Sequence, residues 1–235
     1  MSFGHLIINI VELLAALAGS YYWLKTKDQT IRPFVWYLWF VVLIETIALY
    51  PYLYGNIDNA LINWLEHSLM RRNTWLYNIY YLVSLLLIWM FMKRNIKVSF
   101  SHKVINITVF LCIGIIILYF LTSGNFFKTT IDYPFAIATF AIFTMAIVYL
   151  WELVRSDQIL SFYKDHVFYI IIAMVLFYIC ITPLVLFSEY FNLRNKGFIQ
   201  FRGLLLTISN IILYSCYIFA FFYSLHHKKK LELQK

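Results

Sequence analysis

Charged residues are scarce in this sequence, and their distribution excludes an ordinary soluble domain. Only 13% of the 235 residues are Asp, Glu, Lys or Arg, whereas 63% are hydrophobic and 20% are Phe, Trp or Tyr. Soluble domains carry about 25% charged residues. None of the 19 Lys and Arg residues falls within seven long apolar runs, so most of the chain is expected to face lipid or other helices.

Cysteine and glycine are also sparse, and both absences limit the chemistry. The cysteines, Cys112, Cys180 and Cys216, are odd in number and form no CxxC pair, so we expect small buried apolar side chains and no disulfide framework. No HxxxH or HExxH pair indicates a metal site, and the histidines lie at the ends of runs or in loops, where interfacial positions explain them. No Gly-rich phosphate loop or GxSxG elbow occurs, which argues against nucleotide-driven and serine-hydrolase chemistry.

The apolar runs predict an all-α fold, a polytopic bundle of seven transmembrane helices that forms a single domain over residues 1–235. Each run has roughly the 20 residues needed to cross a bilayer. Their approximate bounds are 5–24, 33–54, 74–92, 104–122, 134–154, 167–187 and 203–225. Helices are expected because no period-two alternation indicates a β-barrel. Pro51 and Pro183 fall inside two runs and are expected to kink or end those helices.

The basic residues predict how the bundle is oriented. One side of the membrane carries 13 of the 19 Lys and Arg residues and the other side carries six. The positive-inside rule then places the N-terminus outside and the C-terminus in the cytoplasm, in the cytoplasmic (inner) membrane. Because these residues are spread over loops and tail, no nucleic-acid partner is predicted. Membrane lipids are the expected partner, with anionic headgroups at Lys228, Lys229 and Lys230.

Two carboxylates, Glu12 and Glu45, lie near the middle of the first two runs. At 1.5 Å per residue they are about 10 and 14 Å from the outer ends of their helices, so they share a layer. Glu12 shares a helix face with Asn9, Ala16 and Gly19, and small residues on that face let a neighbouring helix approach closely. An ionisable group held in hydrocarbon is a candidate functional residue, so a ligand-binding or proton-linked role is favoured for both.

Other polar side chains are expected at comparable depth in the third, sixth and seventh runs. With the two glutamates they predict one outward-facing polar cavity, to which the fourth and fifth runs contribute little. The further residues of this predicted site are Asn78, Tyr178, Thr182, Asn210 and Tyr214. Interhelical hydrogen bonding without a ligand is the alternative, and it is favoured for the two asparagines.

Two features nearer the membrane surface also carry expectations. Glu152 is expected to pair with Arg155, three residues on, at the cytoplasmic end of the fifth run. The segment 58–70 places Leu61, Leu65 and Leu69 at helical spacing beside Trp64, which predicts a helix lying in the headgroup layer. That helix acts either as a lid over the cavity or as a connector.

Short motifs in three runs carry a family resemblance. They are residues 73–80 (NTWLYNIY), the Glu45 position and residues 208–214 (ISNIILY). Together they resemble uncharacterised small seven-helix integral membrane proteins common in Bacteroidota. Related sensor-like modules are joined to kinases, so the resemblance implies a sensory or accessory role. Only about ten residues follow the seventh run, so output through a separate cytoplasmic or membrane partner protein is expected.

Function is narrowed by one exclusion and left open among several classes. No lysine lies in any predicted span, which excludes a retinal Schiff base, and no cofactor is predicted. The leading interpretation is a binding or sensory module whose cavity holds a small or lipidic ligand. The alternatives are a small-solute or proton-coupled transporter, a lipid-acting enzyme with Glu12 and Glu45 as acid and base, and a structural subunit. The enzyme is disfavoured because no nucleophile or oxyanion motif accompanies the glutamates.

Overall fold

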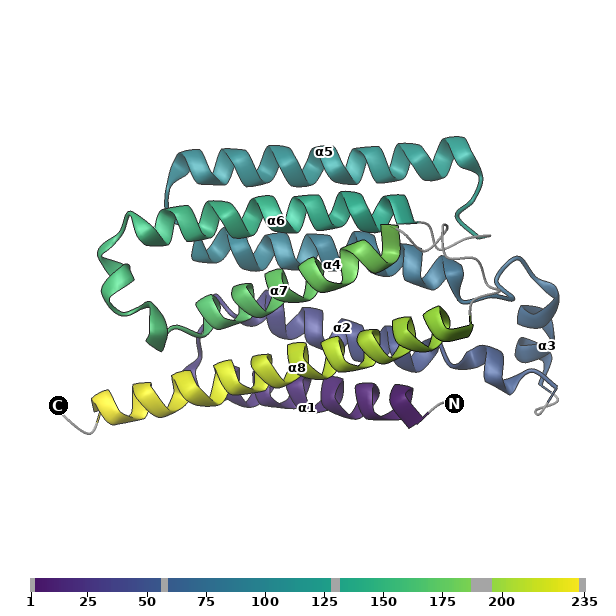
Figure 1. The fold of residues 1–235 in the computed structure, drawn as a ribbon, viewed down its shortest axis with the longest axis horizontal. Helices are drawn as coiled ribbons and strands as arrows, with labels where there is room; N and C mark the ends of the chain where they lie inside the picture. The colour runs from purple at the N-terminus through teal and green to yellow at the C-terminus, as the bar shows by residue number, and fades with distance from the viewer. Residues whose placement is uncertain (1–2, 56–58, 128–131, 187–195, 233–235) are drawn as a thin grey trace.

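The computed structural model describes residues 3–55, 59–127, 132–186 and 196–232. The described chain is dominated by long helices (Figure 1). The helices, with 3₁₀ helices labelled η, are in chain order α1 (Phe3–Thr26), α2 (Arg32–Ile47), η1 (Tyr50–Leu53), α3 (Ala60–His67), α4 (Thr74–Asn95), α5 (Ser99–Ser123), α6 (Asp132–Val154), η2 (Asp157–Leu160), η3 (Phe162–Lys164), α7 (His166–Leu186) and α8 (Lys196–Glu232).

Six of the long helices pack as a closed ring. α1 packs against α2 and α8, α2 against α4, α4 against α6, α6 against α7, and α7 against α8. α5 lies outside this ring, against α4 and α6 (Figure 1). The N-terminus and α3 lie at one end of the bundle, here called the α3 end, and α8 finishes at the other, here called the C-terminal end.

Within the described residues seven helices are long and apolar enough to cross a membrane, and the chain is a multi-pass integral membrane protein. Their bounds agree closely with the predicted runs, and lysines in them, such as Lys25 and Lys93, lie in terminal turns. Apolar side chains cover the outside of α5, where Ile107 is 66% exposed and Leu121 is 77% exposed. Cys180 is exposed too, so the expectation of a buried side chain is wrong there and holds for Cys112.

The two prolines inside predicted spans have different effects. α2 ends at Ile47, four residues before Pro51, and a short 3₁₀ helix follows. Pro51 has no N–H to offer the Ile47 carbonyl, and its ring clashes with that group, so the α-helix stops there. Pro183 lies inside α7, which continues to Leu186, so of the two expected effects Pro183 does not end its helix, and a kink there stays a prediction.

Small residues on α1 bring its neighbours close, as their spacing predicts. Ala15 and Ala16 have no exposed surface. At Gly19 an added Cβ would lie 3.1 Å from the Phe221 ring of α8 and 3.3 Å from Leu38 of α2. The face of α1 that carries Glu12 therefore points into the bundle.

A helix forms in the segment predicted to lie at the interface, and the predicted ion pair of Glu152 does not form. α3 begins after Asn59, whose side chain accepts a hydrogen bond from the Leu61 N–H at 2.9 Å, and Trp64 is 59% exposed. Glu152 Oε1 instead accepts hydrogen bonds from the backbone N–H groups of Lys97 and Val98, at the entry to α5.

Among the described residues Glu152 and Arg155 form no ion pair, and the Arg155 guanidinium lies 4.0 Å from the centre of the Trp151 ring. Two fixed backbone donors bind Oε1 without ordering a long basic side chain, which explains why the predicted pair does not form, and Oε2 has no hydrogen-bond partner among the described residues.

Candidate functional site

The two predicted glutamates meet at a groove between α1 and α2. Its volume is about 240 Å³, and we call it the glutamate groove; it is lined by Leu6, Asn9, Ile10, Glu12, Leu13, Val42, Glu45 and Thr46. Glu12 and Glu45 are close enough to interact electrostatically. The expectation that these two carboxylates share a layer is therefore confirmed.

Glu12 lies at the buried side of the groove. Its side chain is 4% exposed, and it is hydrogen-bonded to Tyr214 of α8. Its Oε2 atom is fully buried and has no hydrogen-bond partner among the described residues. A buried acceptor without a partner is uncommon and demands a specific explanation, such as a bound group that is absent from the protein alone.

Glu45 is more open than Glu12. It is half-buried, two residues before α2 ends, and its Oε2 accepts a hydrogen bond from the Tyr77 hydroxyl of α4 at 3.3 Å. The early end of α2 before Pro51 places this carboxylate near the last turn of its helix, where the predicted span had placed it deeper. α1, α2, α4 and α8 therefore all contribute to the groups around the groove.

Tyrosines continue the polar region from Glu12 into the ring of helices. The Tyr37 and Tyr80 side chains are hydrogen-bonded to each other, and both interact electrostatically with Glu12. Tyr178 lies near Tyr37, as does the fully buried Tyr217, whose hydroxyl has no partner among the described residues. Tyr214 therefore contacts Glu12 directly, whereas Tyr178 is connected to it through Tyr37, and this cluster draws on α1, α2, α4, α7 and α8.

The other three predicted residues make local structural contacts, and of the seven predicted site residues only Glu12 and Glu45 are among those that line the groove. Asn78 is buried and donates from Nδ2 to the Phe126 carbonyl at 2.8 Å, which ties α4 to the segment after α5. Thr182 donates to the Tyr178 carbonyl, and Asn210 donates from Nδ2 to the Leu206 carbonyl, in each case four residues back in the same helix. These contacts favour the structural alternative for Asn78, Thr182 and Asn210.

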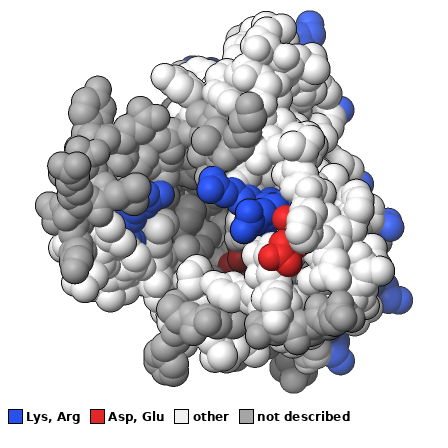
Figure 2. Space-filling model, turned by 90° about the vertical axis from the view of Figure 1, so that its right-hand side faces the viewer, with Lys and Arg blue, Asp and Glu red and all other residues white. Residues whose placement is uncertain are grey.

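The α3 end of the molecule is hollowed at its centre. Figure 2 views this end and shows Lys and Arg side chains beside the hollow, with acidic side chains at its edge and deeper inside. Glu12 and Glu45 lie toward this end, because α1 begins here and α2 finishes here (Figure 1).

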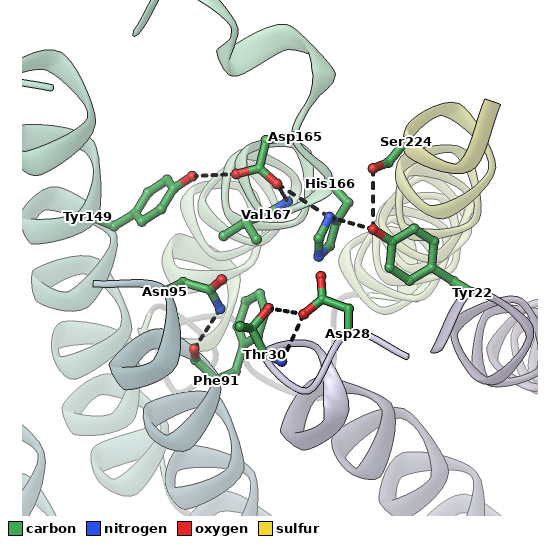
Figure 3. A network of polar contacts seen from close by, with 10 residues as sticks. All are labelled: Tyr22, Asp28, Thr30, Phe91, Asn95, Tyr149, Asp165, His166, Val167 and Ser224. Atoms are coloured by element: carbon green, nitrogen blue, oxygen red, sulfur yellow. Dashed lines mark hydrogen bonds and ion pairs between the residues drawn. The ribbon is translucent and has the colours of Figure 1, made fainter. Parts of the chain in front are cut away.

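A larger polar cavity, which the sequence did not reveal, lies at the C-terminal end. It measures about 500 Å³, and we call it the aspartate cavity; it is lined by Asp28, Thr30, Asn95, Leu153, Ser161, Phe162, Lys164, Asp165, His166, Val167, Ser224 and His227. Figure 3 shows the Asp28 carboxyl facing the His166 ring across this space.

Hydrogen bonds join three helices around the aspartate cavity. The Tyr22 hydroxyl of α1 lies 3.2 Å from His166 Nδ1 of α7 and 3.4 Å from Ser224 Oγ of α8 (Figure 3). His166 Nδ1 is also 3.3 Å from Asp165 Oδ1. Tyr22, His166 and Ser224 are each at most 4% exposed.

Sequence reasoning missed this cluster because it assigned every histidine to the interface. The available signal was the pair of Asp165 and His166 at the start of an apolar run. Asp165 accepts a hydrogen bond from the Val167 N–H at 3.1 Å, which is the pattern of a helix N-cap.

A layer of aromatic rings separates the two polar regions. Phe34 of α2 lies 5.0 Å from Phe91 of α4, 6.3 Å from Phe221 of α8 and 5.0 Å from Tyr217, between ring centres. On α8, Phe221 falls between Tyr217 on the Glu12 side and Ser224 on the Asp28 side. The three phenylalanines are at most 1% exposed, so water does not reach this layer.

Neither region resembles a metal centre. In the parts of the chain that the structure describes, no group of three or more His, Cys, Asp or Glu side chains is placed to hold a metal ion.

Comparison with known protein families, with curated proteins and with solved structures finds no match for this chain. The fold defines a seven-helix integral membrane protein, and its function has to be argued from the groove and the cavity themselves.

Proposed function

We propose that this protein is a ligand-binding, sensory membrane module that acts with a separate partner protein. The observation that carries the proposal is the buried Glu12 Oε2 atom, which has no partner among the described residues and lies at a groove open to the outside of the bundle. An ionisable group in the membrane is expensive to keep, and a ligand that hydrogen-bonds to it supplies a reason for its presence. The resemblance to sensor-like seven-helix proteins supports the same function.

α8 is the element suited to carry a signal along the bundle. Tyr214 of α8 is hydrogen-bonded to Glu12, and Ser224 of the same helix contacts Tyr22 at the aspartate cavity. With 37 residues α8 is about 56 Å long, against about 30 Å of bilayer hydrocarbon. Ligand contacts that shift Tyr214 would therefore move a helix that extends past the ends of α1, α2 and α5 (Figure 1).

The proposed orientation places the glutamate groove in the outer half of the cytoplasmic membrane and the aspartate cavity on the cytoplasmic side. The excess of Lys and Arg on the loops at the C-terminal end supports it. α3, with Leu61 and Trp64 exposed, would then lie in the outer headgroup layer. A cytoplasmic or membrane partner would meet the protruding end of α8.

Purification in mild detergent tests the sensory proposal. We expect the wild-type protein to retain a small molecule, detected by mass spectrometry of the extracted sample, and a partner protein detected after cross-linking. Glu12→Gln should lose most of the bound molecule because it removes the charge that the ligand neutralises. Glu66→Gln, on α3 and outside the groove, is the matched control and should retain it. A wild-type preparation with neither ligand nor partner would contradict the proposal.

A proton-coupled transporter is the second candidate, and one observation favours it. Two polar regions, one at each end of the bundle, are separated by the layer of Phe34, Phe91 and Phe221, so a solute pathway that joined them would be closed in this conformation. Proteoliposomes with and without a pH gradient test it. A transporter should show gradient-driven uptake that Glu45→Gln abolishes, whereas a sensory module should show none in either form.

A further inference from the structure

The outer wall of the glutamate groove faces the surroundings of the bundle. Leu6, Ile10 and Leu13 line it and are 46%, 50% and 41% exposed. All three lie on α1 within a membrane-spanning helix, so their exposed surfaces meet lipid. The groove therefore opens sideways, toward the acyl chains of the bilayer.

The inner wall of the groove consists mainly of hydrogen-bond acceptors. Glu12 and Glu45 supply carboxyl oxygens. The Thr46 hydroxyl donates its hydrogen to the Val42 carbonyl at 2.7 Å, which leaves its lone pairs for a ligand. Asn9 is the other polar residue, and among the described residues no Lys or Arg lines the groove. This wall favours a head that donates hydrogen bonds and carries positive charge, and it repels a phosphate or carboxylate.

The size of the groove limits what it can enclose. Its volume is about 240 Å³, below the range of roughly 300–1,000 Å³ found for pockets that enclose a whole drug-sized molecule. A primary ammonium group and the first methylenes of a chain fit this space. The rest of the chain would remain in the bilayer beside Leu6, Ile10 and Leu13.

We propose that the ligand of the glutamate groove is a single-chain amphiphile with an amine head, which enters from the bilayer between α1 and α2. This rests on the proposed ligand-binding function and names its ligand class. The ammonium would lie between Glu12 and Glu45 and give the buried Glu12 Oε2 the donor that the described protein groups do not provide. An ammonium group between two carboxylates in a medium of low dielectric is strongly attracted to both.

The test uses dodecylamine as the probe, with the full chain in phosphatidylcholine nanodiscs and occupancy read by native mass spectrometry. We expect saturable binding of one dodecylamine per protein. Glu12→Gln and Glu45→Gln should each weaken binding at least tenfold, and Glu66→Gln should leave it unchanged. Dodecanoate of the same chain length should not compete, and dodecanol should compete weakly. Binding of dodecanoate at or above the level of dodecylamine would overturn the assignment of an amine head.

Entry from the bilayer is tested separately at the mouth of the groove. Ile10→Trp fills the mouth with a large side chain on the lipid-facing side of α1, where misfolding is not expected because Ile10 is 50% exposed. It should slow dodecylamine uptake, whereas Leu121→Trp, at a 77% exposed position of α5, should not. Equal uptake of dodecylamine by the wild type, Ile10→Trp and Leu121→Trp would exclude lateral entry of an amphiphile. Water-soluble butylamine that binds the groove as tightly as dodecylamine would exclude it too.

The two proposals fail in different ways. If the protein binds a ligand of another class, the purified wild type retains a molecule that dodecylamine does not displace. If it binds no ligand at the groove, nothing is retained and dodecylamine shows no saturable occupancy. The first result overturns the amine assignment alone, and the second overturns both.

Discussion

Glycine 19 shows how a single residue sets the distance between helices. Its position on α1 lets the Phe221 ring and Leu38 approach so closely that a Cβ atom would lie 3.1 and 3.3 Å from them. Phe221 belongs to the aromatic layer, so the absence of a side chain at Gly19 helps to close the barrier between the two polar regions.

Gly19→Leu is therefore expected to destabilise the protein by about 1–3 kcal/mol, the usual range for overpacking a well-packed core. The measurement is the thermal unfolding midpoint in detergent, followed by fluorescence-detected gel filtration. Gly114→Leu is the matched control, since a Cβ at Gly114 on α5 meets nothing within 4 Å. An equal loss of stability in both variants would show that the tight contact at Gly19 does not matter.

Glu152 is a second residue whose role depends on its partners. Replacing it by Ala removes the acceptor from two backbone N–H groups, those of Lys97 and Val98, and is expected to cost about 1–3 kcal/mol. Hydrogen exchange at these two amides should accelerate in Glu152→Ala and change much less in Glu152→Gln, which keeps a carbonyl acceptor. Arg155→Ala should leave both amides protected; if it exposes them as much as Glu152→Ala does, the ion-pair interpretation returns.

Among the helices, α1, α7 and α8 are joined through one hydroxyl group. The Tyr22 hydroxyl links His166 of α7 with Ser224 of α8, deep enough that all three side chains are at most 4% exposed. Of these helices α7 and α8 also line the aspartate cavity, and α1 and α8 carry Glu12 and Tyr214. This contact therefore fixes the relative position of helices that both polar regions share.

Tyr22→Phe is expected to lower stability by about 1–2 kcal/mol, because it removes a buried hydrogen-bonding group while preserving the ring. Unfolding in a denaturing detergent, followed by circular dichroism, measures the change. Tyr21→Phe is the matched control, since Tyr21 is 46% exposed on the lipid-facing side of the same helix. Similar stability of Tyr22→Phe and the wild type would mean that packing alone positions α7 and α8.

For the whole molecule, the main expectation concerns its orientation in the membrane. In a background without Cys112, Cys180 and Cys216, single cysteines at Leu61 and Leu160 mark the two ends, and both positions are well exposed, at 70% and 82%. A membrane-impermeant maleimide added to intact cells should label Leu61→Cys and should label Leu160→Cys only after lysis, because the positive-inside rule places α3 outside. The opposite pattern would reverse the proposed positions of both polar regions.

The architecture of the molecule was largely predictable because its main signal is local. A run of about 20 apolar residues must form a helix when its backbone groups have no water to bond, whatever its neighbours are. The bounds of the seven helices follow from this rule. Two other local signals, the helical spacing of apolar residues and Pro51, predict the amphipathic α3 and the end of α2. That α5 lies outside a ring of six was not predictable, because apolarity does not distinguish lipid from a neighbouring helix.

The candidate site was predictable only where an unusual residue type marked it. Glu12 and Glu45 were identified because a carboxylate in an apolar run is conspicuous, and the groove brings them together. Asn78, Thr182 and Asn210 were assigned to the same cavity, yet their amide and hydroxyl groups bond to backbone carbonyls. An amide or hydroxyl group can donate to a nearby backbone carbonyl, whereas an ionised carboxylate cannot. The depth of a residue in its span is therefore a weaker sign of a shared site for Asn and Thr than for Glu.

By itself the sequence determined that this protein crosses the membrane seven times and keeps two acids inside, because length, apolarity and charge act on each segment alone. Only the tertiary structure decided which side chains face each other. It placed Tyr214 on Glu12 and left Glu12 Oε2 without a partner in the described parts of the chain, and it gathered Asp28, Asp165 and His166 around a cavity at the far end. Those contacts join residues far apart in the chain, and they depend on how helices pack, which no single segment specifies.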